Sequence, residues 1–337
     1  MSNFKGKNGA LLIAEIGGNH EGNFSYAKKL TKLAIESKVD VIKFQIYTGD
    51  KLVSKIESPK RNKHFKKFEL SKKEHIYLAE MVKEAKIKYS SSVWDINTLN
   101  WINKYIDIYK IGSGDLTAYP VLKKTAELGK PIIISSGLSS EKEVIDSVNY
   151  IQNVNSIYFE KNYLGVLQCT SMYPIMDTDV NLKVLERFKE IFNLTIGYSD
   201  HTEGFKALQY AYAIGAEILE FHFTDDRTKK EFRDHKVSLT KEEIQLLINE
   251  IKLINNFKGN EIKKPLKIEI INGHDISFRR AVYPSRDLLK GETLSDENLT
   301  VLRPNTGIDS RDYSKLIGKK VNRNFMKHEK LNWKNIE

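Results

Sequence analysis

The sequence predicts an α/β protein, a (β/α)8 barrel followed by a small second domain. Short apolar runs rich in β-branched residues alternate with amphipathic helical segments, as expected for buried parallel strands and the helices that cover them. Eight such runs follow one another, which favours a closed barrel over an open sheet. The turn after the first run, residues 17–22, reads GGNHEG and lacks the GxGxxG spacing of a dinucleotide-binding sheet.

The expected elements fill the first three quarters of the chain in strict alternation. The strands are expected at residues 11–16, 41–46, 87–92, 106–111, 131–135, 164–168, 194–198 and 216–220. The helices are expected at residues 25–37, 72–86, 118–128, 140–151, 182–191, 204–214 and 241–255, with a weaker helix at 96–105.

The pattern changes near residue 258, and three regions are predicted. Residues 1–258 form the barrel, residues 259–276 a charged linker, and residues 277–337 a small domain of short strands and turns. This last region holds 13 Lys and Arg against 8 Asp and Glu, so it carries half of the net charge of +10. The small domain is therefore expected to be basic.

Composition limits the compartment and the partners. Cys169 is the single cysteine, so no internal disulfide can form, and no apolar stretch is long enough for a signal peptide or membrane span. We expect a cytoplasmic protein without a membrane partner. The densest basic run, residues 60–67, has no nucleic-acid motif around it, and no nucleic-acid partner is expected. A solvated loop is favoured there over a surface that attracts an anionic substrate.

Polar residues collect where the predicted strands end, which is where the active sites of such barrels lie. Two of them, Lys43 and Lys110, are charged residues within apolar strands, and a buried lysine needs a partner or a role. One alternative is a pair of internal ion pairs to Glu15 or Asp115. The favoured alternative is a clamp for phosphate and carboxylate groups, completed by the hydroxyls of Ser92, Ser113, Ser135 and Ser199.

Two histidines stand at neighbouring strand ends. His201 follows the seventh strand and His222 the eighth, and the axes of adjacent strands are roughly 5 Å apart. Two imidazoles so placed can share a divalent ion, although core packing is an equally good account of them from position alone. His20 lies in a loop and is not expected to be a ligand.

Six motifs in order resemble the signatures of the sialic acid synthase family, over essentially the whole chain. They are EIGGNHEG at 15–22, KFQ at 43–45, YKIGSG at 109–114, CTSMYP at 169–174, GYSDHT at 197–202 and HFT at 222–224. The tail, with Arg303 in RPNTGI, resembles the antifreeze-like SAF domain of that family. The resemblance implies a TIM barrel with a SAF domain, and an enzyme that condenses phosphoenolpyruvate with an N-acylated amino sugar.

The resemblance also implies roles for individual residues. His201 and His222 are expected to hold Mn²⁺ or Mg²⁺, with Glu15, Gln45 and Asp115 as the catalytic residues. Phosphoenolpyruvate is expected at Lys43, Ser92, Lys110, Ser113, Ser135, Ser171 and Ser199, and the sugar at Tyr173, Asp234 and Arg303. Arg303 is expected to come from the partner subunit of a domain-swapped homodimer.

The sequence departs from the family pattern at several points near these residues. The loop after His222 reads EFRDHK at 231–236, where relatives carry Gly-Pro-Asp, so Arg233 is an addition beside the expected sugar site. This predicts an acceptor other than plain N-acetylmannosamine, such as a di-N-acetylated trideoxyhexose. Two alternative functions stay open, a Schiff-base aldolase that uses Lys43 or Lys110 and a carbohydrate-binding protein without activity.

Overall fold

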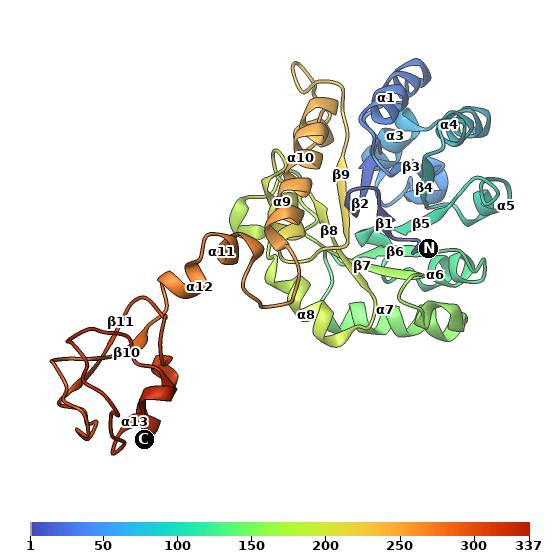
Figure 1. Cartoon of the computed structure of the whole chain (residues 1–337). Coiled ribbons are helices and arrows are strands. Elements are labelled where there is room, and N and C mark those ends of the chain that lie inside the picture. The colour runs from blue at the N-terminus through green and yellow to red at the C-terminus, as the bar shows by residue number, and fades with distance from the viewer. Residues whose placement is uncertain (1) are drawn as a thin grey trace. The chain divides into compact units, whose positions relative to one another are not determined.

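The computed structural model describes residues 2–337, which divide into one unit that ends at Gly259 and a second over Asn260–Glu337. In the first unit eight parallel strands close into a barrel that helices surround (Figure 1). The strands are β2 (Gly9–Glu15), β3 (Val41–Ile46), β4 (Lys88–Val93), β5 (Ile108–Ile111), β6 (Ile132–Ser135), β7 (Leu164–Cys169), β8 (Thr195–Asp200) and β9 (Ile218–His222). Pairing of β2 with β9 closes the barrel and confirms the predicted fold.

One outer helix of the barrel follows each strand in turn. These helices are α1 (Phe24–Glu36), α4 (Lys72–Glu84), α5 (Leu99–Ile102), α6 (Tyr119–Ala126), α7 (Glu141–Val154), α8 (Lys183–Ile191), α9 (Lys206–Ala213) and α10 (Lys241–Lys258). Two further helices, α2 (Gly49–Leu52) and α3 (Pro59–Phe68), lie between β3 and α4. The weak helix expected at residues 96–105 is a 3-10 turn followed by α5.

Local sequence fixes where several helices begin. A serine or threonine before α4, α7 and α10 accepts a hydrogen bond from a backbone N–H of the first turn, and a glutamate three residues later accepts one from the cap residue in return. Such a capping box satisfies backbone N–H groups that have no partner inside the helix. These three helix starts therefore follow from the sequence alone.

The barrel interior is apolar at the amino-terminal end and polar at the carboxyl-terminal end. A cluster that includes Leu11, Val41, Ile108 and Leu167 fills the lower part, and Phe4 packs into it from below. The strand β1 (Lys5–Gly6) pairs with the start of β2 and holds Phe4 in place. Because this floor is filled, the space inside the barrel opens only toward the ends of the strands.

The second unit has its own small core. The strands β10 (Ala281–Pro284) and β11 (Leu299–Leu302) pair in antiparallel fashion, and α13 (Tyr313–Leu316) packs with them. The stretch predicted as a linker carries two short helices, α11 (Lys267–Ile271) and α12 (His274–Ser277). Among residues 2–337 we find no helix with the length and apolar character that a membrane crossing requires.

Candidate active site

A cleft of about 1010 Å³ opens at the carboxyl ends of the barrel strands. It is lined by fourteen of the fifteen site residues predicted from the sequence. These are Glu15, Lys43, Gln45, Ser92, Lys110, Ser113, Asp115, Ser135, Ser171, Tyr173, Ser199, His201, His222 and Asp234. They come from all eight strands or the loops that follow them, so a single ligand in the cleft can contact most of the barrel.

Arg303 is the exception. It directly follows β11 in the second unit, is exposed, and has its guanidinium 5.3 Å from the ring centroid of Phe278. The structure therefore brings the fourteen barrel residues together in one cleft, and their roles, like that of Arg303, stay predictions.

Lys43 is paired with carboxylates at the floor of the cleft. Its Nζ lies 2.6 Å from Oε2 of Glu15 and 3.6 Å from Oε1 of Glu220, and all three side chains are buried. The register sets Glu15 directly opposite Lys43 on β3 and opposite His222 on β9. Gln45 donates a hydrogen bond of 2.8 Å to the other oxygen of Glu15, which fixes that carboxyl group between two strands.

Glu220 is a site residue that the sequence analysis missed. Its carboxylate lies between the two buried lysines, 3.6 Å from Lys43 and 3.7 Å from Lys110. The less favoured alternative of internal ion pairs is therefore realised for Lys43 with Glu15, whereas Lys110 pairs with Glu220 and not with Asp115. A carboxylate two residues before His222, on a strand that is otherwise apolar, was the signal that could have identified it.

The buried charges shift one another's pKa values. Burial lowers the pKa of Lys110, with the carboxylate of Glu220 opposing this shift. Burial alone would also lower the pKa of Lys43, but Glu15 and Glu220 hold it above its usual value. Burial raises the pKa of Glu15, whereas the two lysines bring that of Glu220 below its usual value despite burial. Glu220 is thus held ionised, and Glu15 is suited to hold or release a proton.

Hydroxyl groups surround the second lysine. The ammonium of Lys110 donates a hydrogen bond of 2.6 Å to Ser135 and one of 3.2 Å to the carbonyl of Ile111. On the neighbouring loop, the N–H of Gly137 donates to Ser113 Oγ at 3.1 Å. A Cβ at Gly137 would come within 2.6 Å of that oxygen, so this close approach requires glycine. The cluster presents donors for phosphate or carboxylate oxygens.

His201 and His222 lie at the ends of the paired strands β8 and β9, with ring centroids 5.4 Å apart. Nδ1 of His201 donates to the carbonyl oxygen of Thr170 at 2.8 Å, which leaves Nε2 free to bind a ligand. Burial lowers the pKa of both histidines, and that of His222 most strongly. Both rings are therefore neutral at pH 7, the form in which imidazole binds metals.

Tyr173 and the loop after β9 line the cleft beside the two histidines. The ring of Tyr173 stacks obliquely on His201 with 3.9 Å between centroids, and the guanidinium of Arg233 lies 4.6 Å from the centroid of the same tyrosine. Asp234 has one oxygen 3.4 Å from Nε of Arg233 and the other 3.9 Å from Nδ1 of His222. Arg233 thus contacts both barrel residues that are expected to meet the sugar.

The basic run at residues 60–67 is not the solvated loop that the sequence analysis favoured. It forms most of α3, and Arg61, His64 and Lys67 line the cleft. Asn62 on the same helix is buried and donates hydrogen bonds to the carbonyls of Gly49 and Val53, which anchors α3 to α2. Because these anchors are tertiary contacts, the sequence pattern gave no sign of the helix.

Buried polar atoms without a hydrogen bond gather in the cleft. Of ten such side-chain atoms among the described residues, five belong to the cleft lining. Glu15 Oε2, Glu220 Oε2 and Asp234 Oδ1 have ion-pair contacts with Lys43, Lys110 and Arg233, whereas Trp94 Nε1 and His222 Nδ1 have no hydrogen-bond partner. Leaving a buried polar group unpaired costs about 1–3 kcal/mol, so such groups usually mark a ligand. Within residues 2–337 no three His, Cys, Asp or Glu side chains are grouped closely enough to hold a metal ion by themselves.

Comparison with known proteins identifies the family. The model of the NeuB family matches residues 30–263, and the model of the SAF domain matches residues 279–337. The chain belongs to the NeuB family. It is therefore a synthase, which confirms the enzyme class predicted from the sequence. The match to the SAF domain confirms the predicted C-terminal domain.

Relatives of this NeuB family member include named synthases. An N,N'-diacetyllegionaminic acid synthase of Campylobacter jejuni is 33% identical, with 95% of this chain and 98% of the relative covered. An enzyme of the same name from Legionella pneumophila is 34% identical, with coverage of 97% and 94%. An N-acetylneuraminic acid synthetase of Leptospira borgpetersenii, solved with citrate, is 30% identical with a TM-score of 0.72, over 78% of this chain and 90% of that one.

Proposed function

We propose that this protein condenses phosphoenolpyruvate with an N-acylated amino sugar and releases a nonulosonic acid and phosphate, with the help of a divalent metal. The observation that carries the proposal is the meeting of two neutral histidines and two buried lysines in one cleft of a NeuB family barrel. The histidines suit a divalent metal, and the lysines suit the anionic groups of phosphoenolpyruvate.

The reaction begins with attack of the methylene carbon of phosphoenolpyruvate on the aldehyde carbon of the open-chain sugar. The new C–C bond leaves cationic character on the carbon that bears the phosphate. Water adds to that carbon, and the tetrahedral intermediate loses phosphate by cleavage of its C–O bond. The oxygen of the water becomes the keto oxygen of the product, and the bridging oxygen leaves with the phosphate.

The chain supplies groups for each of these steps. Lys43, Lys110 and the surrounding hydroxyls hold the carboxylate and phosphate and stabilise negative charge as it shifts between them. Asp115, whose pKa burial raises to about 6, is in the pKa range for a group that takes a proton from the attacking water. Glu15 lines the same cleft, and burial raises its pKa, which makes it the second candidate for proton transfer.

His201 and His222 are proposed to hold a Mn²⁺ or Mg²⁺ ion. The free Nε2 of His201 and the buried Nδ1 of His222, which has no hydrogen-bond partner, fit such an ion. The carboxylate of Asp234 beside His222 fits the ion or the water bound to it. Bound there, the ion would act as a Lewis acid toward the aldehyde oxygen of the sugar. Two histidine nitrogens leave most of the coordination shell to substrate and water, in agreement with the small number of grouped ligands.

The charge of the cleft also supports a metal. Six carboxylate residues line it, namely Glu15, Glu21, Asp115, Glu220, Glu231 and Asp234, against five cations, Lys43, Arg61, Lys67, Lys110 and Arg233. Such a lining has no net positive charge for a multiply charged anion. A divalent ion reverses the sign and allows phosphoenolpyruvate to enter.

The acceptor is proposed to be a 2,4-diacetamido-trideoxyhexose. The names of the Campylobacter and Legionella relatives refer to a di-N-acetylated acid, and Arg233 adds hydrogen-bond donors beside Tyr173 and Asp234. A second acylamino group offers a carbonyl acceptor for a donor-rich side chain at that place. N-acetylmannosamine has no such group.

The active protein is proposed to be a homodimer in which the partner subunit contributes Arg303. The first helix of the second unit and the residue before it leave apolar side chains exposed, a feature of subunit contacts. They are Leu266, Ile268, Ile270 and Ile271, each at least 52% exposed. A second copy that covers this face would also bring a second SAF domain to the assembly.

The experiment that tests the function is turnover across a panel of acceptors. Phosphoenolpyruvate labelled with ¹⁸O at the bridging position is incubated with N-acetylmannosamine or with diacetamido-trideoxyhexoses. We expect condensation, with the label in the released phosphate and the highest kcat/KM for a di-N-acetylated sugar. A clear preference for N-acetylmannosamine would refute the acceptor, and label retained in the acid would refute the proposed C–O cleavage.

A Schiff-base aldolase is the second candidate, because burial lowers the pKa of Lys110 and so favours its neutral, nucleophilic amine. Borohydride treatment with pyruvate separates the two functions. The synthase is expected to stay active and unlabelled, whereas the aldolase would be trapped as a covalent adduct on a lysine and would not respond to chelators.

A further inference from the structure

Asp234 and His235 are neighbours in the short 3-10 helix Arg233–His235, yet their side chains lie in different surroundings. Asp234 lines the cleft beside His222, whereas His235 is fully buried and is absent from the cleft lining. A 3-10 turn places successive side chains about a third of a turn apart. Whatever fixes the ring of His235 therefore fixes the position of Asp234 in the cleft.

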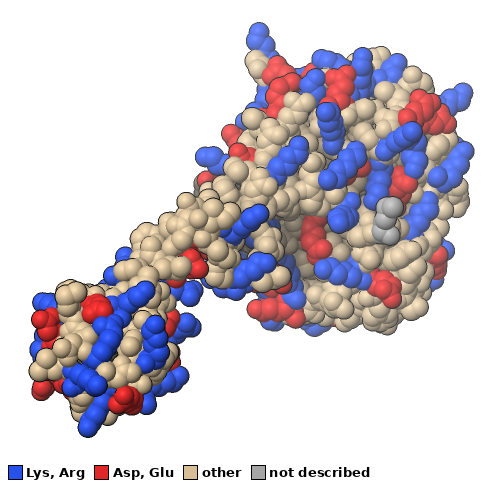
Figure 2. Space-filling view, in the orientation of Figure 1, with Lys and Arg blue, Asp and Glu red and all other residues tan. Residues whose placement is uncertain are grey.

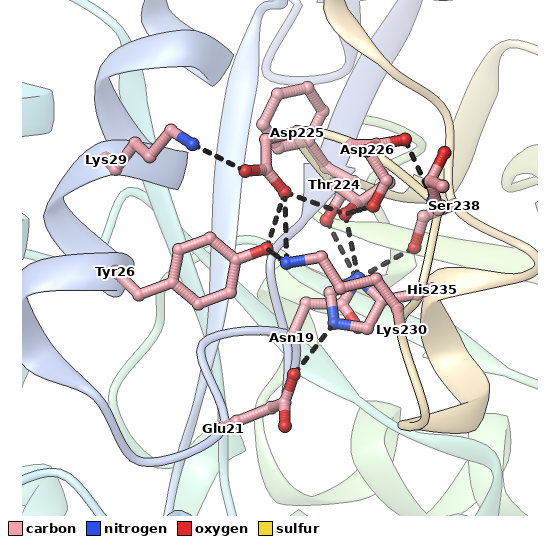
Figure 3. A network of polar contacts seen from close by, with 12 residues as sticks. Asn19, Glu21, Tyr26, Lys29, Thr224, Asp225, Asp226, Lys230, His235 and Ser238 are labelled. Atoms are coloured by element: carbon pink, nitrogen blue, oxygen red, sulfur yellow. Dashed lines mark hydrogen bonds and ion pairs between the residues drawn. The ribbon is translucent and has the colours of Figure 1, made fainter.

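His235 connects three parts of the chain (Figure 3). Its Nδ1 lies 2.7 Å from the hydroxyl of Thr224, two residues beyond His222, and its Nε2 lies 3.3 Å from a carboxylate oxygen of Glu21 on the loop after β2. A carboxylate only accepts hydrogen bonds, so Nε2 carries the proton and Nδ1 accepts from Thr224. One ring thus links the end of β9, the first barrel loop and the turn that bears Asp234.

The backbone around this ring is held from two further sides. Ser238 donates to the carbonyl of Asp234 at 2.6 Å, and Asn19 donates both to Ser238 and to the carbonyl of Phe223, at 2.8 Å each. At the outer end of the loop, Asp225 accepts hydrogen bonds from Tyr26 and Lys29. Figure 3 shows the side chains of α1 reaching across to this loop. Hydrogen bonds thus hold the loop from Asp225 to Lys236 near both of its ends, and His235 links it to Thr224 and Glu21.

We propose that His235 is a positioning residue: it holds Asp234 at the distance from His222 at which acceptor sugar and metal are bound. The proposal rests on the proposed function for its kinetic part. Four observations carry it: the complete burial of the ring, its two hydrogen bonds to separate segments, its covalent adjacency to Asp234, and the place of the Asp234 carboxylate in the cleft, 3.9 Å from Nδ1 of His222.

The test replaces His235 by phenylalanine, which keeps most of the ring volume and removes both hydrogen bonds. His75→Phe is the matched control, because His75 is also buried, lies in α4 and does not line the cleft. For H235F we expect kcat/KM for the sugar to fall roughly 10- to 100-fold, the size typical when a residue that orients a metal-site group loses its hydrogen bonds, with KM for phosphoenolpyruvate within about twofold of wild type. Mn²⁺ binding, measured by calorimetry without substrates, is expected to weaken. H75F is expected to keep all three values.

Two further variants assign the contacts. His235→Asn keeps a polar group near Nδ1 and the link to Thr224, whereas His235→Gln keeps one near Nε2 and the link to Glu21. Each is expected to recover part of the loss of H235F, as positioning through hydrogen bonds requires. If H235F and H75F lose the same thermal stability while the folded H235F keeps wild-type kcat/KM and Mn²⁺ affinity, the role of His235 is packing alone and the proposal is wrong.

Hydrogen exchange keeps this proposal separate from the proposed function. If the wild type shows no synthase activity, the proposed function is wrong. Hydrogen exchange of the amides of residues 225–236 then still tests whether His235 holds this loop in place. Faster exchange there in H235F than in H75F supports positioning of the loop, and equal exchange contradicts it.

Discussion

The imidazole rings of His201 and His222 stand with centroids 5.4 Å apart at the ends of two paired strands, both buried and both neutral. The spacing follows from the pairing of β8 with β9, since each histidine stands at the end of its strand. Among the residues that the structure describes, His64 on α3 is the only other histidine that lines the cleft. The proposed metal site therefore depends on these two side chains.

Replacement of His222 by alanine is expected to abolish metal-dependent turnover while the fold survives. The side chain is a proposed ligand and lines the cleft, so we expect kcat to fall at least about 100-fold. Phosphate release and thermal melting measure the two effects. Full activity of metal-stripped H222A would contradict the metal site.

Activity is expected to decline below about pH 6. Burial raises the pKa of Asp115 to about 6, so the ionised form that can accept a proton is lost as the pH falls through that value. The logarithm of kcat/KM should then drop by one per pH unit. In Asp115→Asn this limb of the profile should vanish together with most of the activity. An unchanged acid limb in D115N would assign it to another group, with Glu15 the next to test.

Glu220→Gln is expected to destabilise the free enzyme. Glu220 is the shared partner of two buried lysines, and removal of one charge from such a network typically costs about 3–5 kcal/mol. Glu217→Gln is the control, because its pair with Lys161 is about half exposed and is worth less than about 1 kcal/mol. Urea unfolding measures both variants. Equal losses of unfolding free energy in the two variants would show that the charge of Glu220 does not stabilise the buried lysines.

Glu220 also gives the sign of the pH dependence of stability. Its pKa lies below the usual value in the folded chain, so its contribution is present above the ordinary glutamate pKa and is lost as the pH falls through the lower folded value. The difference in unfolding free energy between wild type and E220Q should therefore shrink on acidification. A difference that grows toward low pH would contradict this assignment.

Complementation of two inactive variants is expected to show whether Arg303 acts on the partner subunit. In a mixed dimer of H222A and Arg303→Ala, one site receives an intact His222 together with the arginine of the other chain. Random mixing should then restore about a quarter of wild-type activity. Recovery at this level, measured after co-expression of equal amounts without separation of the dimers, supports the swap. No recovery would mean that Arg303 acts within its own chain or not at all.

Most of the barrel could be predicted from the sequence, because buried parallel strands are short apolar runs and their ends are where polar residues are tolerated. The same rule brought fourteen predicted residues to one cleft. The helix α3 could not be predicted, because its run of lysines shows no apolar period and its anchor, Asn62, bonds to carbonyls of another helix. Glu220 and His235 escaped notice since their partners lie across strand pairs or on distant loops.

The metal dependence of phosphate release most directly tests whether this protein is a metal-dependent synthase. Purified protein is stripped with EDTA, and release of phosphate from phosphoenolpyruvate is followed with a 2,4-diacetamido-trideoxyhexose, before and after Mn²⁺ is restored. We expect no release in EDTA, recovery with Mn²⁺, and one nonulosonic acid formed for each phosphate. Condensation at an undiminished rate in EDTA would contradict this expectation.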